Sequence, residues 1–220
     1  MIRLFILVID CLPVWIFVIP IMIILQYVVF RQRSFRKFFV ALLFAFYLLG
    51  VFYVTGIPFF DEFRIDFHFQ WIPFVDIVNG PAGYLKNTAL NIILFMPMGF
   101  LLPALWKEYR PFKITLLTGF AVSLMIEVLQ IFTFRLTDID DLITNTLGTA
   151  AGYYLWKAAR KRLKSCQGDF KQIEEGKKTG WYEPLIILAA VLLIHFFLKP
   201  VILDVVWDWV LSSSWWAGVR

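Results

Sequence analysis

The stretch FRLTDIDDLITN, Phe134 to Asn145, holds an arginine, three aspartates and an asparagine. It joins two strongly apolar segments, Ile114–Phe134 and Leu142–Trp156. Each segment is long enough to form a helix, so the polar stretch predicts a short turn between two neighbouring helices. This turn concentrates charge at the junction of two hydrophobic helices. The reason for this charge must lie in the residues that surround the turn.

The composition identifies the class of protein. Of 220 residues, 60% are hydrophobic and only 17% are charged, more apolar surface than a soluble domain of this length can bury. A helix crosses a bilayer core of about 30 Å with roughly 20 apolar residues. The sequence therefore predicts an all-α protein, a polytopic transmembrane helical bundle of about six spans. The expected spans are Leu4–Phe30, Phe38–Phe60, Thr88–Trp106, Ile114–Phe134, Leu142–Trp156 with a little of each flank, and Pro184–Val206.

The basic residues predict how the chain is oriented. Loops 31–37, 107–113 and 157–180 alternate with the remaining loops and hold 15 of the 21 Lys and Arg residues. By the positive-inside rule these loops are cytoplasmic and both termini lie outside a multi-pass plasma-membrane protein. The net charge of +5 then requires no nucleic-acid partner. The run RKRLK, 160–164, is either a topology determinant or a contact for anionic lipid.

These boundaries predict five regions along the chain. They are two N-terminal transmembrane helices in 1–60, an outer loop in 61–87, a core of three spans in 88–156, a basic cytoplasmic loop in 157–183, and a C-terminal transmembrane helix with a Trp-rich outer tail in 184–220. In the outer loop, FRIDFHFQW (63–71) alternates apolar and polar residues with a period of two. This pattern predicts an extended segment near 61–87 that lies along the outer interface or covers a polar pocket. His68 in this segment is a candidate proton carrier or a plain surface histidine.

Three of the expected helices each carry a polar stripe near their outer ends. Ser123, Glu127 and Gln130 follow helical spacing in one helix, Asp141 and Asn145 in the next, and Asn87 and Asn91 in the one before. An unpaired ionisable group at this depth costs at least about 2.5 kcal/mol, so we expect the stripes to face the interior of the bundle or a water-filled cavity.

Part of this polarity has a purely structural explanation. Thr137 or Asp138 is a suitable N-cap for the following helix, and Asp140 and Asp141 would then lie in its first turn, where the helix dipole favours carboxylates. On this reading Asp140→Asn should cost about 1 kcal/mol or less. Helix packing likewise accounts for Gln130 and for the GxxxG pair Gly148 and Gly152.

Packing does not require four ionisable groups at one level of a membrane. Glu127, Arg135, Asp138 and Asp141 together therefore predict a functional pocket.

The motifs around this pocket resemble the VanZ-like family. The resemblance covers FQWIPF (69–74), NIILFMPMGFLLP (91–103) and SLMIEVLQIFTFRLTDIDDLITNTLGTAAGYYL (123–155), in the order and spacing of the family. The matching residues are Asn91, Phe95, Pro97 and Gly99, then Glu127 and Gln130, then Arg135, Asp138, Asp141, Asn145 and Gly148. The chain departs from the family at Gln70-Trp71-Ile72, where an Asn-Leu pair is usual.

The resemblance implies a cell-envelope protein of a Gram-positive bacterium, linked to low-level resistance against teicoplanin or other lipoglycopeptides. The pocket itself suits the anionic, hydroxyl-rich headgroup of a membrane lipid, a lipid-linked cell-wall intermediate or a glycolipid. The expected headgroup-binding residues are Asn91, Glu127, Gln130, Arg135, Asp138, Asp141 and Asn145, with Pro97, Gly99, Gly148 and Gly152 in structural roles. Arg135 would contact phosphate, and Asp138 and Asp141 would bind hydroxyls, a proton or a divalent cation, the one candidate cofactor.

Two alternatives to binding remain open. Glu127, Asp138 and Asp141 are candidate catalytic residues of a membrane-embedded enzyme acting on an envelope lipid, although the chain has no familiar catalytic or phosphate-binding motif. Transport is the third hypothesis, without an internal repeat to support it. The sequence predicts neither an oligomeric state nor roles for Asp10, His195 and Lys199, which lie outside the resemblance; Asp10 and Lys199 are a conceivable ion pair.

Overall fold

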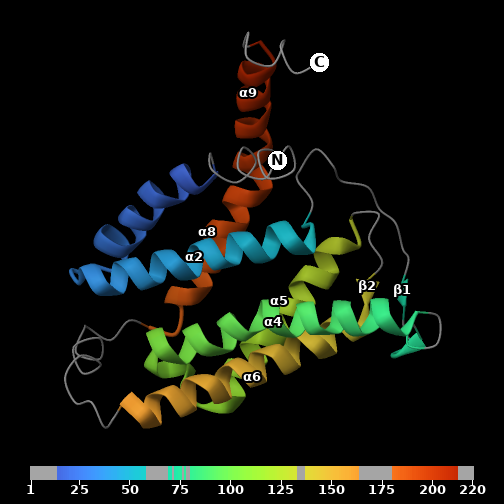
Figure 1. The fold of residues 1–220 in the computed structure, drawn as a ribbon. Coiled ribbons are helices and arrows are strands. Elements are labelled where there is room, and N and C mark those ends of the chain that lie inside the picture. The colour runs from blue at the N-terminus through green and yellow to red at the C-terminus, as the bar shows by residue number, and fades with distance from the viewer. Residues whose placement is uncertain are drawn as a thin grey trace.

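The protein is a helical bundle (Figure 1). The computed structural model describes residues 14–57, 69–70, 72–75, 77, 80–132, 137–163 and 180–212. Its helices are Val14–Val29, which ends in the π-helix η1 (Ile24–Val29), α2 (Phe35–Thr55), α4 (Pro81–Leu105), η2 (Lys107–Tyr109), α5 (Phe112–Gln130), α6 (Ile139–Leu163), α8 (Glu183–Leu193), the π-helix η3 (Ile194–Leu198) and α9 (Lys199–Ser212). The last three follow one another without a break, so every expected span has a helical counterpart.

Four helices are long and apolar enough to cross a membrane: Phe35–Thr55, Pro81–Leu105, Phe112–Gln130 and Glu183–Trp209. The apolar helix Val14–Val29 is shorter. Helix α6 has 25 residues, but its acidic start and basic end leave it with little net hydropathy. Several of its polar side chains, Thr144, Asn145 and Thr149 among them, are buried. Helix α6 thus belongs to the bundle by packing rather than by hydropathy.

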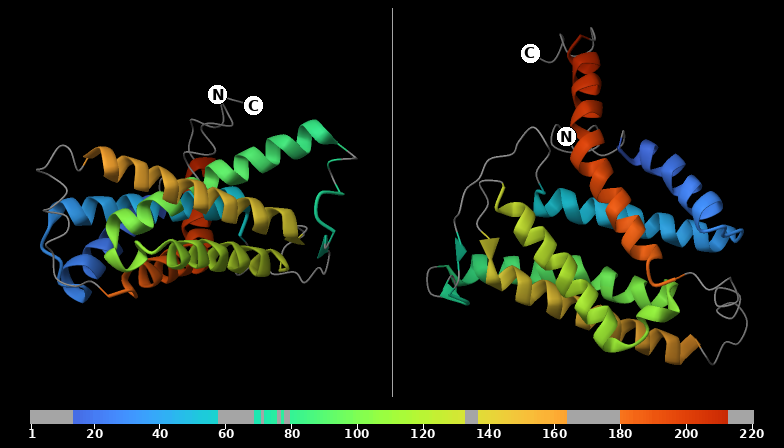
Figure 2. Two further views of the ribbon diagram at one scale, coloured as in Figure 1. Left: turned by 90° about the horizontal axis from the view of Figure 1, so that it is seen from below. Right: turned by 180° about the vertical axis from the view of Figure 1, so that it is seen from behind.

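The helices form two groups. Helices α4, α5 and α6 pack together on one side, and Val14–Val29, α2 and the continuous helix α8–α9 lie on the other (Figure 1, Figure 2). Phe52, Phe95 and Ile187 are fully buried and belong to the apolar core between the two groups.

Helix α4 begins at Pro81, two turns before the expected Thr88. Proline suits the first turn of a helix, where its missing N–H would have no intrahelical partner. Residues 81–87 are therefore helical, and the expected extended segment is shorter than 61–87. Pro97 and Pro103 lie inside α4 without ending it.

Glycines bring α4 and α6 into backbone contact. A Cβ atom on Gly148 would overlap the carbonyl group of Ile92, and one on Gly152 would overlap that of Met96. On the α4 side of this contact, a Cβ on Gly99 would overlap the carbonyl group of Thr149 in α6. The contact of Gly148 with Ile92 is followed, four residues later on both helices, by that of Gly152 with Met96, so α4 and α6 run parallel and side by side. Close approach through small residues is how helices associate in membranes, where the hydrophobic effect cannot drive their contact.

Candidate functional site

The polar turn between α5 and α6 is tied to a buried carboxyl group. Glu127 is only 4% exposed, and its Oε2 accepts the backbone N–H of Asp138 at 3.1 Å. Asp138 Oδ1 in turn accepts the backbone N–H of Asp140 at 2.9 Å. This is the bond of an N-cap residue, so Asp138 caps α6. The first turn of α6 and the last turns of α5 are thereby held together.

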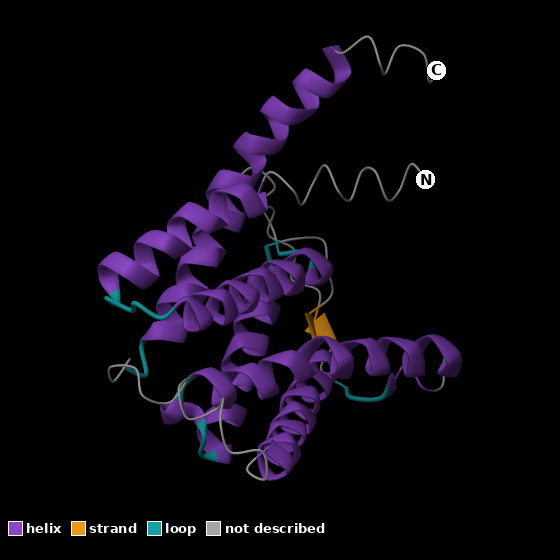
Figure 3. Cartoon of the chain, turned by 60° about the vertical axis from the view of Figure 1, so that its left-hand side comes forward, coloured by secondary structure: helices purple, strands orange, loops and turns teal. Residues whose placement is uncertain are grey.

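A short strand pair brings the outer segment to this turn. Strand β1 (Phe69–Gln70) pairs in parallel with strand β2 (Thr137–Asp138), with Phe69 opposite Thr137 and Gln70 opposite Asp138 (Figure 3). The expected extended conformation is thus present at residues 69–70. The backbone at Gln70, where the chain departs from the family pattern, lies beside Asp138.

Asp140 has a role that the sequence analysis missed. It is 4% exposed, and its Oδ2 and Oδ1 accept the backbone N–H of Phe74 at 2.9 and 3.2 Å. Phe74 has φ of 66°, an uncommon conformation for a bulky residue. Asp140 therefore anchors the turn after β1 to α6 and is not merely a first-turn carboxylate. The only sequence signal was the position of Pro73-Phe74 within the family block FQWIPF, and it does not identify a partner.

We expect Asp140→Ala to detach this turn. The N–H of Phe74 would lose its acceptor, at a cost of about 1–3 kcal/mol. Asp140→Asn should cost less, because its carbonyl oxygen still accepts one bond. The measurements are the melting temperature and the rate of proteolysis within 57–81. Equal stability of Asp140→Ala and the wild type would contradict the anchoring role.

The neighbouring helices contribute amide groups to the same region. Asn91 of α4 donates from Nδ2 to Asp141 Oδ1 at 2.6 Å, and Asn145 of α6 donates from Nδ2 to Ser123 Oγ of α5 at 2.9 Å. Asn145 is buried, and its Oδ1 has no hydrogen-bond partner among the described residues. A buried acceptor of this kind calls for a donor from water or from a ligand.

We call Asn91, Glu127, Asp138, Asp141 and Asn145 the outer cluster, after the side of the membrane that the sequence predicts for it. The carboxyl groups of Asp138 and Asp141 lie within electrostatic range of Glu127. Three carboxyl groups this close together favour a bound cation, a proton or hydrogen-bond donors. No three His, Cys, Asp or Glu side chains in the described part of the chain are arranged to hold a metal ion.

One expected member of this cluster stands apart from it. Gln130 is buried and donates from Nε2 to the backbone carbonyl of Thr55 at 2.7 Å, which joins α5 to the end of α2. Arg135 lies outside the described residues, as do His68 and Asp10.

The end of α2 also receives side chains from the last helix. His195 Nε2 lies 3.1 Å from the carbonyl oxygen of Ile57, and the ammonium group of Lys199 lies 4.7 Å from the ring centroid of Tyr53. Both side chains are buried. These contacts connect α8–α9 to α2.

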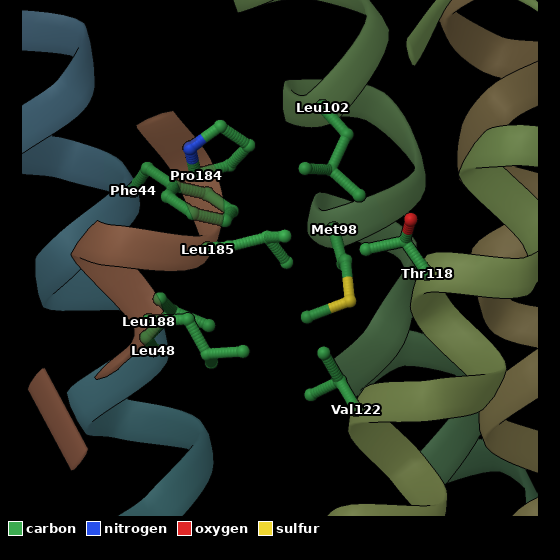
Figure 4. Close-up of a pocket in the computed structure, with 9 residues that line it drawn as sticks. All are labelled: Phe44, Leu48, Met98, Leu102, Thr118, Val122, Pro184, Leu185 and Leu188. Atoms are coloured by element: carbon green, nitrogen blue, oxygen red, sulfur yellow. The ribbon is translucent and has the colours of Figure 1, made fainter. Parts of the chain in front are cut away.

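The outer cluster is distinct from an apolar pocket between the two helix groups. Nine side chains from α2, α4, α5 and α8 line this pocket (Figure 4): Phe44, Leu48, Met98, Leu102, Thr118, Val122, Pro184, Leu185 and Leu188. Its volume is about 10 Å³, room for about one water molecule. Since its walls offer no charged group, it is a packing defect rather than a headgroup site.

Comparison with known proteins places this site in a family. The chain is 40% identical to Protein VanZ of Enterococcus faecium over 87 residues, which are 37% of this chain and 51% of the relative. The match thus spans about half the length of that relative. No solved structure matches the chain. The VanZ/LLP1 family model matches residues 44–160, more than half of the sequence and all of the outer cluster. This membrane protein therefore belongs to the VanZ/LLP1 family.

Proposed function

We propose that the outer cluster is an outward-facing pocket that binds the headgroup of an anionic envelope lipid or glycolipid, and that this binding underlies low-level resistance to teicoplanin-type lipoglycopeptides. The observation that carries the proposal is the convergence of Glu127, Asp138 and Asp141 at one junction of membrane helices. Carboxyl groups are costly at that depth, and helix packing alone does not require three of them.

The chemistry of the cluster supports a hydroxyl-rich headgroup. The carboxylates and the Oδ1 of Asn145, which has no partner among the described residues, are acceptors for sugar or glycerol hydroxyl groups. Arg135, three residues before Asp138, is the proposed contact for phosphate, because its planar guanidinium group forms two parallel bonds with that group. A divalent cation held by Asp138 and Asp141 is a second way to bridge the carboxylates to a phosphate.

Lipid binding by the purified protein tests the proposal. We expect phosphatidylglycerol, which is anionic and carries hydroxyl groups, to raise the melting temperature more than phosphatidylcholine does. Asp141→Asn should remove this difference, because the amide lacks the charge of the carboxylate. Asp204→Asn, an exposed site in α9, is the matched control and should retain it. An unchanged preference in Asp141→Asn would exclude Asp141 from the binding site.

The buried carboxyl group of Glu127 favours one alternative, an enzyme acting on an envelope lipid. Burial makes a carboxyl group a suitable general acid or base, and the carboxyl group of Asp138 lies within electrostatic range of Glu127. Turnover distinguishes the two functions: mass spectrometry would detect a modified lipid after incubation with the wild type and none after incubation with Glu127→Gln.

We further propose that the basic loops are cytoplasmic and that both termini lie outside the plasma membrane. The charge bias of the loops supports this orientation. A reporter that is active only outside should work after Gly80, just before α4, or at the C-terminus. It should stay silent after Lys107 or Lys164. Activity after Lys164 would reverse the orientation and move the outer cluster to the cytoplasmic side.

A further inference from the structure

A second polar cluster lies at the opposite end of α2 from the outer cluster. Gln26 in the π-helix η1 is fully buried, and its Nε2 donates to Glu183 Oε1 at the start of α8 at 2.9 Å. Glu183 is itself 4% exposed. A buried glutamine–carboxylate pair between these helices lies outside the family match, which begins at residue 44.

Two side-chain atoms of this cluster lack partners. Within the described chain, neither Gln26 Oε1 nor Gln32 Nε2 has a hydrogen-bond partner, although both residues are at least nine-tenths buried. Rotating the Gln26 amide would not help, because its oxygen would then face the carboxyl oxygen of Glu183. The backbone N–H of Gln32 donates to the carbonyl of Gln26 at 2.8 Å, so the two residues share one turn. One turn of the chain therefore holds a buried acceptor and a buried donor, and neither has a hydrogen-bond partner among the described residues.

The charges near these amides are balanced. Lys37, near the start of α2, is half-buried and interacts electrostatically with Glu183 and, less strongly, with the oppositely charged neighbours Lys107 and Glu108. The cluster thus presents acceptors in Glu183 and Gln26 Oε1, and donors in Lys37 and Gln32 Nε2. One negative and one positive group complement a zwitterion. A purely anionic headgroup would instead meet the carboxylate of Glu183.

We propose that Gln26, Gln32, Lys37 and Glu183 form an inner site for the headgroup of a zwitterionic aminophospholipid of the phosphatidylethanolamine class. The primary ammonium group donates to Glu183 and Gln26 Oε1, and the phosphate accepts from Gln32 Nε2 and Lys37. The site lies where membrane-spanning helices begin and end, the depth at which headgroups reside. The π-helix at Gln26 is consistent with a binding role, since such irregular turns are frequent at functional sites.

Native mass spectrometry of the full-length protein in detergent tests this site. We expect phosphatidylethanolamine to be retained about tenfold more than phosphatidylcholine, whose trimethylated nitrogen cannot donate a hydrogen bond. In Asp141→Asn, whose outer cluster no longer favours phosphatidylglycerol, phosphatidylethanolamine should also be retained more than phosphatidylglycerol. Glu183→Gln and Gln32→Met should each remove this preference. Asp204→Asn and Asp141→Asn should both retain it, so failure here is distinguishable from failure of the outer cluster.

Two results would overturn the inner site. Equal retention of phosphatidylethanolamine and phosphatidylcholine would mean that water alone satisfies the buried amides. A preference of Asp141→Asn for phosphatidylglycerol would mean that the charge assignment is wrong. Glu183→Gln keeps the volume and hydrogen-bonding capacity of the side chain, and its melting temperature shows whether it folds. If it does not fold, Gln32→Met decides alone: unchanged retention in that variant contradicts the proposal.

Discussion

Glu127→Gln and Asp141→Asn should abolish resistance to teicoplanin-type antibiotics in a host that expresses this protein. Both changes preserve side-chain volume and most hydrogen-bonding capacity, so the helices should still pack. An amide nevertheless lacks the charge that a carboxylate offers to a cation, and it does not gain or lose a proton near neutral pH. Arg135→Lys should have the same effect, because lysine cannot make the planar two-point contact of arginine with phosphate.

The measurement is drug susceptibility, with membrane abundance and melting temperature determined in parallel. Asp204→Asn is the matched control, since it makes the same chemical change on an exposed part of α9 and should remain resistant. Full protection by Glu127→Gln or Asp141→Asn would show that the outer cluster is scaffold. Failure of these variants to accumulate would instead assign the carboxyl groups to helix packing.

Gly152→Val should prevent α4 and α6 from packing. The backbone carbonyl of Met96 occupies the space that a Cβ atom would need, and a backbone group cannot rotate away as a side chain can. Overpacking of this kind costs about 1–3 kcal/mol, and more when the backbone must move. We expect a large loss of folded protein in the membrane. Because the contact between Asn91 and Asp141 depends on the same helix pair, the outer cluster should be lost as well.

Gly50→Val is the control for this prediction. Gly50 lies in α2, and apart from its own turn of helix no atom of the described residues lies within 4 Å of the position that its Cβ would take. Both variants add the same side chain to a membrane helix, so their difference isolates the α4–α6 contact. Equal accumulation and equal melting temperatures of the two variants would contradict the proposed role of this contact.

The four membrane-length helices of this protein were predictable from local sequence because each is encoded by its own apolar run. Hydropathy located most ends of these four helices to within a few residues. Residue type and position narrowed the N-cap of α6 to Thr137 or Asp138, and the structure shows that it is Asp138. The start of α4 at Pro81 was placed too late, since the polar residues Lys86 and Asn87 conceal two helical turns that hydropathy does not detect.

The spacing of polar residues also predicted which side chains share a face. Ser123, Glu127 and Gln130 are all buried, as a stripe on one side of α5 requires. Periodicity reports the direction of a side chain from its own helix axis, but it carries no information about the partner on another helix. Ser123 forms a hydrogen bond with Asn145 of α6, whereas Gln130 forms one with the end of α2. No spacing rule predicts that two residues on one face have these different partners.

The sequence by itself thus determined a membrane-embedded helical bundle, the family resemblance and the candidate residues of the outer cluster. Only the tertiary structure decided that Asp140 anchors Phe74, and that Gln26 meets Glu183 across 157 positions of the chain. Both are contacts between distant segments. Such contacts depend on how whole helices are placed against one another, and therefore on packing rather than on local residue patterns.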